Sequence, residues 1–290
     1  MSEVQGVAGT PGDYTVTVKT APRYVNENCT ACGDCAAVCE TEVSNDFNFG
    51  MDRRKAAYLP HNMAFPQRYV MDPAMSTDDR DKVKEACKYD AVDFDMEEKT
   101  FDLKVGAVVF NTGWQPYDAT RIDNLGFGRY QNIVTNMMLE RLASGNGPTE
   151  GKIVRPSDDE APKTIAFAQC AGSRDENHLS YCSYICCMAS LKHATYIREQ
   201  YPDAKIYIYY IDLRTPGRKY ENFYAKLKAD ENVFFVKGKV AEVSEESGTG
   251  NIQLVAEDTI SGEKVRQTVD MLVLATGMQP TAAIDKPNAD

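Results

Sequence analysis

The sequence predicts a mixed α/β protein of about two domains, and three observations support this class. Apolar runs at residues 164–169 and 205–211 are separated by a helical stretch at 178–200, the pattern of a βαβ unit with parallel strands. Residues 13–20 alternate polar and apolar side chains, as a half-buried strand does. Hydrophobic residues make up 43% of the 290, which is enough to bury a core in each domain.

The first half of the chain is expected to contain short elements joined by long loops. A Gly-Thr-Pro-Gly turn at residues 9–12 precedes the alternating strand. Residues 40–78 are rich in Asn, Asp, Met and Pro and predict a long loop. The elements expected here are a hairpin through 13–20, a helix at 79–89 that carries Cys87, and a strand at 101–110 that ends in Asn111-Thr112-Gly113.

The second half is expected to begin after residues 144–163, because this stretch is rich in Gly, Pro and Asp and predicts a domain boundary. After the βαβ unit, residues 221–229 have the pattern of a short amphipathic helix. Further apolar stretches broken by glycine turns predict a β-meander with strands at 233–243, 252–257, 265–269 and 271–275. The last strand ends in Thr276-Gly277, which repeats the Thr112-Gly113 ending.

Charge and hydropathy exclude two classes of partner. Asp and Glu number 43 against 32 Lys and Arg, for a net charge of −11, and no basic run argues for nucleic acid or anionic lipid. The longest apolar runs are far shorter than the ~20 residues of a membrane helix. The N-terminal residues lack the basic and apolar regions of a secretory signal, so we expect a cytoplasmic protein without a membrane span of its own.

Nine cysteines in such a chain favour metal or redox chemistry over disulfides. Five form the first cysteine group, which begins with the C-x2-C-x2-C-x3-C spacing of ferredoxins and predicts a [4Fe-4S] cluster. In two-cluster ferredoxins the fourth cysteine of such a run binds the other cluster, and here it precedes Glu rather than Pro. The segment from Cys87 resembles the tail of a second ferredoxin motif. We therefore predict Cys29, Cys32, Cys35 and Cys87 as ligands, with Cys39 as a reserve ligand or a buried apolar residue. A structural zinc site is the alternative.

The second cysteine group lies in an 18-residue window. Cys182 and Cys186 are four residues apart on the expected helix, a spacing that brings side chains within about 5–6 Å. Adjacent helical residues point ~100° apart, so joint binding by Cys186 and Cys187 requires either a loosened first turn or a helix that begins there. The alternatives are buried free cysteines or a redox disulfide, although the group contains no C-x2-C pair. The candidate ligands are Cys170, Cys182, Cys186 and Cys187.

Nucleotide-binding signals are weak. No Gly-x-Gly-x-x-Gly loop occurs, so neither an NAD site nor the usual pyrophosphate loop of an FAD domain can be identified. Glycine at the end of a strand permits close approach of a cofactor, or simply makes a turn. Trp114 follows the first Thr-Gly and either packs on a flavin ring or lies in a core or interface. The candidate cofactor residues are Thr112, Gly113, Trp114, Thr276 and Gly277.

Two long motifs resemble a known family. The segments Gln169-Cys-Ala-Gly-Ser-Arg-Asp-Glu-Asn-His178 and Tyr181-Cys-Ser-Tyr-Ile-Cys-Cys-Met-Ala-Ser-Leu-Lys-His193 resemble the signature of the A subunits of heterodisulfide reductases and their relatives. Residues 50–72, which contain Ala57-Tyr-Leu-Pro-His-Asn-Met-Ala-Phe-Pro-Gln-Arg-Tyr69, look more like one branch, the A subunits of the quinone-interacting membrane-bound oxidoreductases of sulfate reducers. The resemblance covers nearly the whole chain.

The resemblance implies an FAD-containing protein with a thioredoxin-reductase-like fold and an inserted ferredoxin-like [4Fe-4S] module. It implies flavin contacts at both Thr-Gly strand ends, although Asn111 stands where the family has Ala. It also associates the second cysteine group with a non-standard [4Fe-4S] site. Family members begin upstream with a glycine-rich flavin loop and continue beyond the second Thr-Gly, so we expect this sequence to lack both pieces. The implied division is 1–24 and 96–150 in the FAD domain, 25–95 as the ferredoxin-like module, 151–270 as an NAD-domain-like βαβ unit with meander, and 271–290 returning to the FAD domain.

The function implied by the resemblance is that of an electron-transfer subunit, which passes electrons between FAD, one or two [4Fe-4S] clusters and partner subunits. The wider complex would link membrane quinones to adenylylsulfate reduction, with adenylylsulfate reductase as a partner and membrane association through other subunits. The alternative is a non-catalytic iron-sulfur or zinc scaffold that docks a redox partner. An NAD-dependent disulfide reductase is disfavoured by the missing glycine loop. The three histidines are too scattered for a metal site, and we expect His178 and His193 near the second cysteine group or at the surface.

Overall fold

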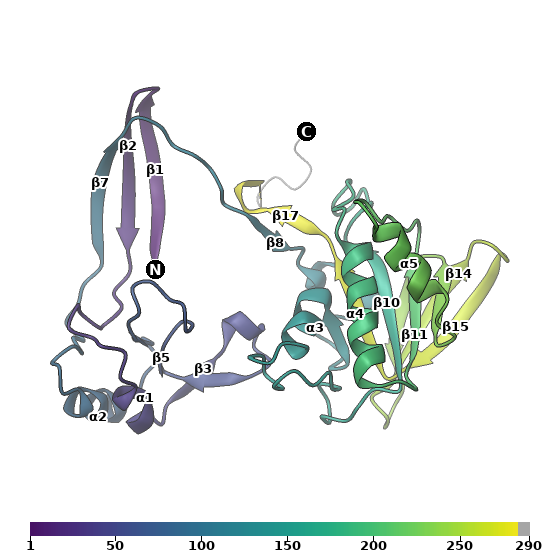
Figure 1. The fold of residues 1–290 in the computed structure, drawn as a ribbon, viewed down its shortest axis with the longest axis horizontal. Coiled ribbons are helices and arrows are strands. Elements are labelled where there is room, and N and C mark those ends of the chain that lie inside the picture. Colours follow the sequence, from purple (N-terminus) through teal and green to yellow (C-terminus); the bar gives the residue numbers. More distant parts are fainter. Residues whose placement is uncertain (284–290) are drawn as a thin grey trace. The chain divides into compact units, whose positions relative to one another are not determined.

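The computed structural model describes residues 1–283, which form two compact units, Met1–Asn111 and the part from Thr112 onward (Figure 1). The predicted α/β class is confirmed, because helices and both parallel and antiparallel sheets are present. Residues 284–290, the end of the segment expected at 271–290, lie outside the described residues. No helix in the described part is long and apolar enough to cross a membrane.

The first unit contains a three-stranded antiparallel sheet. Its strands are β1 (Ser2–Thr10), β2 (Asp13–Thr20) and β7 (Lys99–Val105). The predicted opening hairpin is confirmed, since β1 pairs with β2. The strand expected at 101–110 is too long: β7 ends at Val105, opposite Tyr14, because β2 offers almost no residues beyond its own start for pairing.

Short elements surround the first cysteine group. The loop expected at 40–78 contains two small antiparallel ribbons, so that expectation was only partly right. The helix predicted at 79–89 is present, but it runs from Thr77 to Ala86, so Cys87 follows the helix instead of lying on it. The elements are α1 (Asp34–Val38), β3 (Glu42–Ser44), η1 (Asp46–Asn48), β4 (Arg53–Lys55), β5 (Ala57–Tyr58), β6 (Val70–Met71) and α2 (Thr77–Ala86).

The second unit is built on a five-stranded, all-parallel sheet in the order β12-β11-β10-β16-β9. The βαβ prediction is confirmed, because β10 and β11 pair in parallel on either side of α4. The central strands β10 and β16 are buried along nearly their whole length and are mostly apolar, as expected for strands covered on both faces. The strands are β9 (Ile133–Thr135), β10 (Thr164–Ala171), β11 (Lys205–Tyr210), β12 (Val233–Lys237) and β16 (Met271–Thr276).

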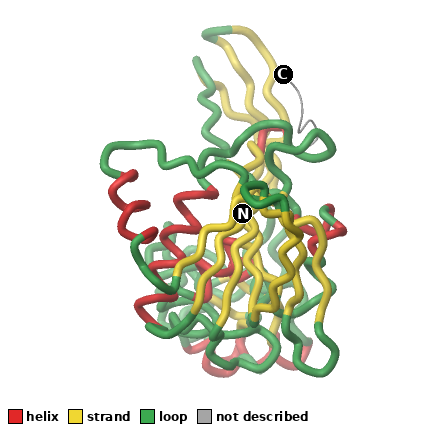
Figure 2. The backbone as a smooth tube through the Cα atoms, turned by 90° about the vertical axis from the view of Figure 1, so that its right-hand side faces the viewer, coloured by secondary structure: helices red, strands yellow, loops and turns green. Residues whose placement is uncertain are grey.

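Two layers cover this sheet. The helices α3 (Asn136–Leu142), α4 (Cys186–Gln200) and α5 (Tyr220–Lys228) pack on one face, and Figure 2 shows helices beside the strands. The other face packs against an antiparallel sheet of β13 (Val240–Glu245), β14 (Ile252–Asp258) and β15 (Glu263–Val269). The meander is thus shorter than predicted, because residues 233–243 divide into β12 and β13 and because β16 joins the parallel sheet. Gly238 marks the division, where a Cβ would lie 1.9 Å from the carbonyl oxygen of Glu257.

The helix expected at 178–200 begins only at Cys186. Residues 178–185 are irregular, and Tyr184, two residues before the helix, has a positive φ value of 64° that is incompatible with helical geometry. A two-stranded ribbon and three 3-10 turns complete the unit: β8 (Trp114–Pro116), β17 (Met278–Pro280), η2 (Ala119–Arg121), η3 (Asp123–Leu125) and η4 (Thr281–Ala283).

Candidate functional site

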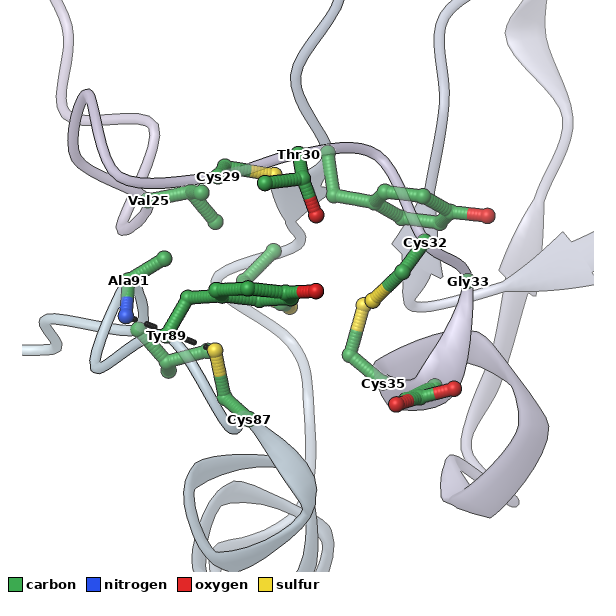
Figure 3. Close-up of a pocket in the computed structure, with 13 residues that line it drawn as sticks. Val25, Cys29, Thr30, Cys32, Gly33, Cys35, Cys87, Tyr89 and Ala91 are labelled. Atoms are coloured by element: carbon green, nitrogen blue, oxygen red, sulfur yellow. Dashed lines mark hydrogen bonds between the residues drawn. The ribbon is translucent and has the colours of Figure 1, made fainter.

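Four thiols of the first cysteine group line one pocket (Figure 3). Two come from the loop before α1, one from the first turn of α1 and one from the residue after α2, and these two helices pack together. The pocket has about 330 Å³ of space, part of it open to solvent. We call it the four-thiol pocket, lined by Cys29, Cys32, Cys35 and Cys87.

The backbone around this pocket turns its amides towards sulfur. Ala31 and Gly33 have φ values of +57° and +93°, which bend the loop between the cysteines. The amide of Ala31 donates to Sγ of Cys29 at 3.5 Å, and the amide of Ala91 donates to Sγ of Cys87 at 3.3 Å. Such donors stabilise negative charge on sulfur.

The walls of the four-thiol pocket are largely apolar, with Val25, Met71 and Val92 among them. Burial raises the pKa of Cys35 to about 12 and also raises the pKa of Tyr69. A thiol in this position ionises only with a compensating positive charge. Metal ions supply that charge, because a coordinating thiol is deprotonated. The donor set and its cavity therefore fit a thiolate-bound iron-sulfur cluster.

Cys39 is not among the residues that line the four-thiol pocket. It is fully buried at the end of α1, and its Sγ donates to the carbonyl oxygen of Thr41 at 3.6 Å and to Oδ2 of Asp79 at 3.8 Å. The same carboxylate oxygen accepts the amides of Glu40 at 3.0 Å and Thr41 at 2.5 Å. With the Thr41 hydroxyl, these bonds lower the pKa of Asp79 to about 2. Cys39 thus belongs to the junction between α1 and α2.

The second cysteine group also converges. Cys170 lies at the carboxyl end of β10, and Cys186 and Cys187 are the first two residues of α4. All four thiols are close enough to interact electrostatically in every pairing. Burial, with the neighbouring thiols, raises the pKa of Cys186 to about 12 and that of Cys170 to about 11. Cys182 lies in the preceding loop, so its expected place on the helix was wrong, whereas the helix does begin at Cys186.

Charged and strained residues that sequence reasoning did not single out surround the second cysteine group. Arg174 forms an ion pair with Asp212 at 2.9 Å, and its positive charge acts on Cys170 and Cys187. Cys170 and Arg174 both have positive φ values, of 57° and 55°. Non-glycine residues in this conformation concentrate at functional sites. Hydrophobic periodicity cannot predict the positive φ values of Cys170 and Arg174, because these depend on the backbone conformation.

A small polar pocket opens beside Cys170. Asp175 and Lys239 form an ion pair across 2.7 Å at its wall. His178 lines the same pocket as Cys170, so it is near the second cysteine group as expected. Its Nδ1 lies 2.9 Å from the hydroxyl of Tyr117. Within residues 1–283, no three or more His, Cys, Asp or Glu side chains are arranged for a single metal ion.

The two Thr-Gly pairs lie at opposite ends of a short antiparallel ribbon, where Gly113 pairs with Thr281 and Gly277 pairs with Tyr117. They lead into β8 and β17, which pair, and the Thr281 hydroxyl donates to the carbonyl oxygen of Thr112 at 2.6 Å. Gly113 and Trp114 are exposed. Thr276 is buried with its hydroxyl 2.9 Å from Oδ1 of Asn136. At Gly277 the neighbouring serines leave no room for a side chain: a Cβ would lie 2.1 Å from Oγ of Ser173 and 2.8 Å from Oγ of Ser183. Thr276 and Gly277 thus contact the chain itself.

The sequence is similar to the A subunits of heterodisulfide reductases from methanogens. It is 42% identical over 286 residues to the second iron-sulfur A subunit of the CoB–CoM heterodisulfide reductase of Methanopyrus kandleri, covering 98% of this chain and 43% of that protein. It is 39% identical over 288 residues to the A subunit of the ferredoxin/F420H2-dependent CoB–CoM heterodisulfide reductase of Methanosarcina acetivorans, covering 98% and 36%. The chain therefore spans about two-fifths of the length of these relatives. No protein-family model matches it.

Solved structures give only distant likenesses. An ornithine N-hydroxylase from Kutzneria aligns with a TM-score of 0.39 and 11% identity, over 96% of this chain and 53% of its own. A thioredoxin reductase from Lactococcus lactis aligns with a TM-score of 0.39 and 10% identity, over 81% and 68%. Scores this low carry no weight for shared fold or function.

Proposed function

Because this chain belongs to the heterodisulfide reductase A-subunit family, we propose that it is an iron-sulfur electron-transfer subunit of an oxidoreductase complex. On this proposal Cys29, Cys32, Cys35 and Cys87 bind one [4Fe-4S] cluster. The names of the relatives, which include "iron-sulfur subunit", support the cofactor class. The wider complex and its partner subunits are part of the proposal.

The four-thiol pocket is the observation that carries this function. Its spacing motif and its geometry agree: the three ferredoxin-spaced cysteines and Cys87 face one cavity, and Cys39 has other partners. A bound cluster would supply reversible one-electron storage. The chain would bind it through four thiolates, direct the amides of Ala31 and Ala91 at sulfur, and limit water access with apolar walls.

The second cysteine group is proposed to hold a second [4Fe-4S] cluster. All four thiols interact, the N-terminus of α4 favours negative charge, and Arg174 adds a positive charge nearby. The buried Cys186 and Cys187 are ordered by hydrogen bonds to the carbonyl oxygens of Thr276 and Asp212. The chain would therefore offer two separate redox sites.

FAD is the less supported cofactor in this proposal. Thr112, Gly113 and Trp114 remain candidates for flavin contact, whereas Thr276 and Gly277 contact Asn136 and the serines of the second unit. Flavin absorbance and fluorescence after denaturation of the purified protein test this part. Stoichiometric FAD supports it, and the absence of FAD from this chain contradicts it.

The finer proposal is that this chain belongs to the branch of the family whose complexes link membrane quinones to adenylylsulfate reduction. It is supported by the segment 50–72, and the names of the methanogen relatives mention neither quinone nor adenylylsulfate. Affinity capture of the complete natural complex tests it. Recovery of a quinone-reactive membrane subunit or of adenylylsulfate reductase supports this branch, and recovery of CoB–CoM heterodisulfide-reducing subunits contradicts it.

Reversible reduction tests electron transfer directly. We expect the anaerobic protein to show EPR signals of reduced [4Fe-4S] clusters after dithionite, and to regain its visible absorbance when an oxidant is added. A redox-silent protein that contains zinc would contradict electron transfer and favour the scaffold function. Cys35→Ala should remove only the signal of the first site, and Cys186→Ala only that of the second.

A further inference from the structure

Among the residues that the structure describes, four buried polar atoms in the layer between α4 and β10 have no hydrogen-bond partner. They belong to three side chains, Gln169 (Nε2 and Oε1), Ser190 (Oγ) and His193 (Nδ1), none more than 4% exposed. Nearly all buried polar groups in proteins are hydrogen-bonded, and each exception calls for an explanation. Their concentration in one layer indicates that the layer has a role beyond packing.

The three side chains line facing surfaces. The ring of His193 stacks on Phe167, with centroids 6.4 Å apart and planes inclined by 22°. Gln169 follows Phe167 by two residues on β10, so both project from the same face of the sheet. Ser190 precedes His193 by three residues on α4, which puts their Cβ atoms about 5–6 Å apart on one helix face. Cys186 begins that same face four residues earlier.

Glu140 determines which nitrogen of the His193 imidazole carries the proton. Its Oε2 lies 2.6 Å from Nε2 of His193 and 2.7 Å from Nζ of Lys192. These contacts lower the pKa of Glu140 to about 2, so it is an anion and Nε2 carries the proton. The other nitrogen, Nδ1, is then a bare acceptor inside the protein. Burial lowers the pKa of His193, so the ring is neutral at rest.

The charges that act on His193 come from two helices. Glu140 of α3 favours its protonation and Lys192 of α4 opposes it. Tyr196 of α4 lies beside the ring, and Phe167 of β10 stacks on it. Seven helical positions separate His193 from Cys186, about 10 Å along the axis. An electron added near Cys186, at the N-terminus of α4, acts on His193 through a layer of low dielectric constant. The added negative charge favours protonation of Nδ1 of His193.

We propose that His193 is the proton acceptor for electron transfer at the second cysteine group. One electron from a one-electron donor enters the group that these thiols hold, and one proton from water binds Nδ1. The added charges cancel, and Glu140, which is hydrogen-bonded to Nε2, stabilises the imidazolium. This inference rests on the proposed function, because it requires a redox group at the second site.

Redox titration of the complete protein, followed by EPR over about pH 6 to 9, tests the inference, with the first site as internal reference. We expect the reduction equilibrium of the second site to fall up to tenfold per pH unit, or 59 mV for one electron. His193→Gln, which retains a polar side chain of similar size, should flatten this dependence. The exposed loop histidine provides the matched control, since His61→Gln should leave it unchanged.

Glu140→Gln gives a second variant at a partly exposed position. It should weaken binding of the proton and shift the pH-dependent range to lower pH. A pH-independent second site with full cluster content, or an unchanged slope in His193→Gln, would overturn the inference while leaving electron transfer intact. Absence of a second cluster would overturn both, and metal analysis of the same sample identifies that outcome.

Discussion

Asp79 is the residue of α2 that joins this helix to the end of α1 in the first unit. Its side chain is 3% exposed, yet it is charged, because four donors and Lys82 at 3.7 Å surround it. Its amide also donates to the hydroxyl of Ser76, which caps the N-terminus of α2. Its bonds to residues 39–41 are long-range and have no sequence signal.

Replacing Asp79 by Asn should destabilise the protein by about 1.5–3 kcal/mol at neutral pH, the range for hydrogen bonds to a charged group. The folded pKa of Asp79 is about 2, below the ordinary 3.8, so its stabilising effect is complete above 3.8 and is lost as pH falls towards 2. Urea unfolding at several pH values measures the difference. A difference that does not shrink in acid would contradict the assignment.

Cys39 and Cys87 make a matched pair for testing the first site. Sequence spacing alone left both as candidates, and the structure separates them, since only Cys87 faces the four-thiol pocket. We expect Cys87→Ala to lose about four irons per chain and Cys39→Ala to retain them while losing some stability. The reverse pattern in iron analysis would show that Cys39 is the ligand.

At the scale of elements, periodicity predicts the strands and the βαβ unit well, because central strands must be apolar and α4 must cover them. Periodicity fails to predict the boundaries of elements where the backbone conformation of single residues ends a helix or strand. The helix pattern begins at residue 178, yet the positive φ value of Tyr184 keeps the segment before Cys186 irregular. Gly238 likewise ends a strand that hydropathy alone extends.

Gly277 links β16 to β17 through close packing on the loop of the second cysteine group. Gly277→Ala should destabilise the second unit by about 1–3 kcal/mol, because its Cβ would overlap Oγ of Ser173. Adding Ser173→Ala should recover part of this loss, a coupling that thermal or urea unfolding of both variants measures. Strict additivity of the two changes would contradict the packing role.

At the scale of the whole molecule, the chain places one cysteine group in each of two compact units. This arrangement suits an electron carrier, because the candidate ligands of each site all come from one unit and neither site needs a ligand from the other. The ferredoxin spacing predicts the first site from the sequence. The second site required the fold, because β10, an irregular loop and the start of α4 bring its cysteines together.

The measurement that tests this account most directly is iron, acid-labile sulfide and zinc per chain on anaerobically purified protein. Two [4Fe-4S] clusters predict about eight irons and eight sulfides per chain, with no stoichiometric zinc. About four of each would retain the four-thiol pocket as a redox site and contradict the second. Stoichiometric zinc without sulfide would contradict electron transfer by this chain altogether.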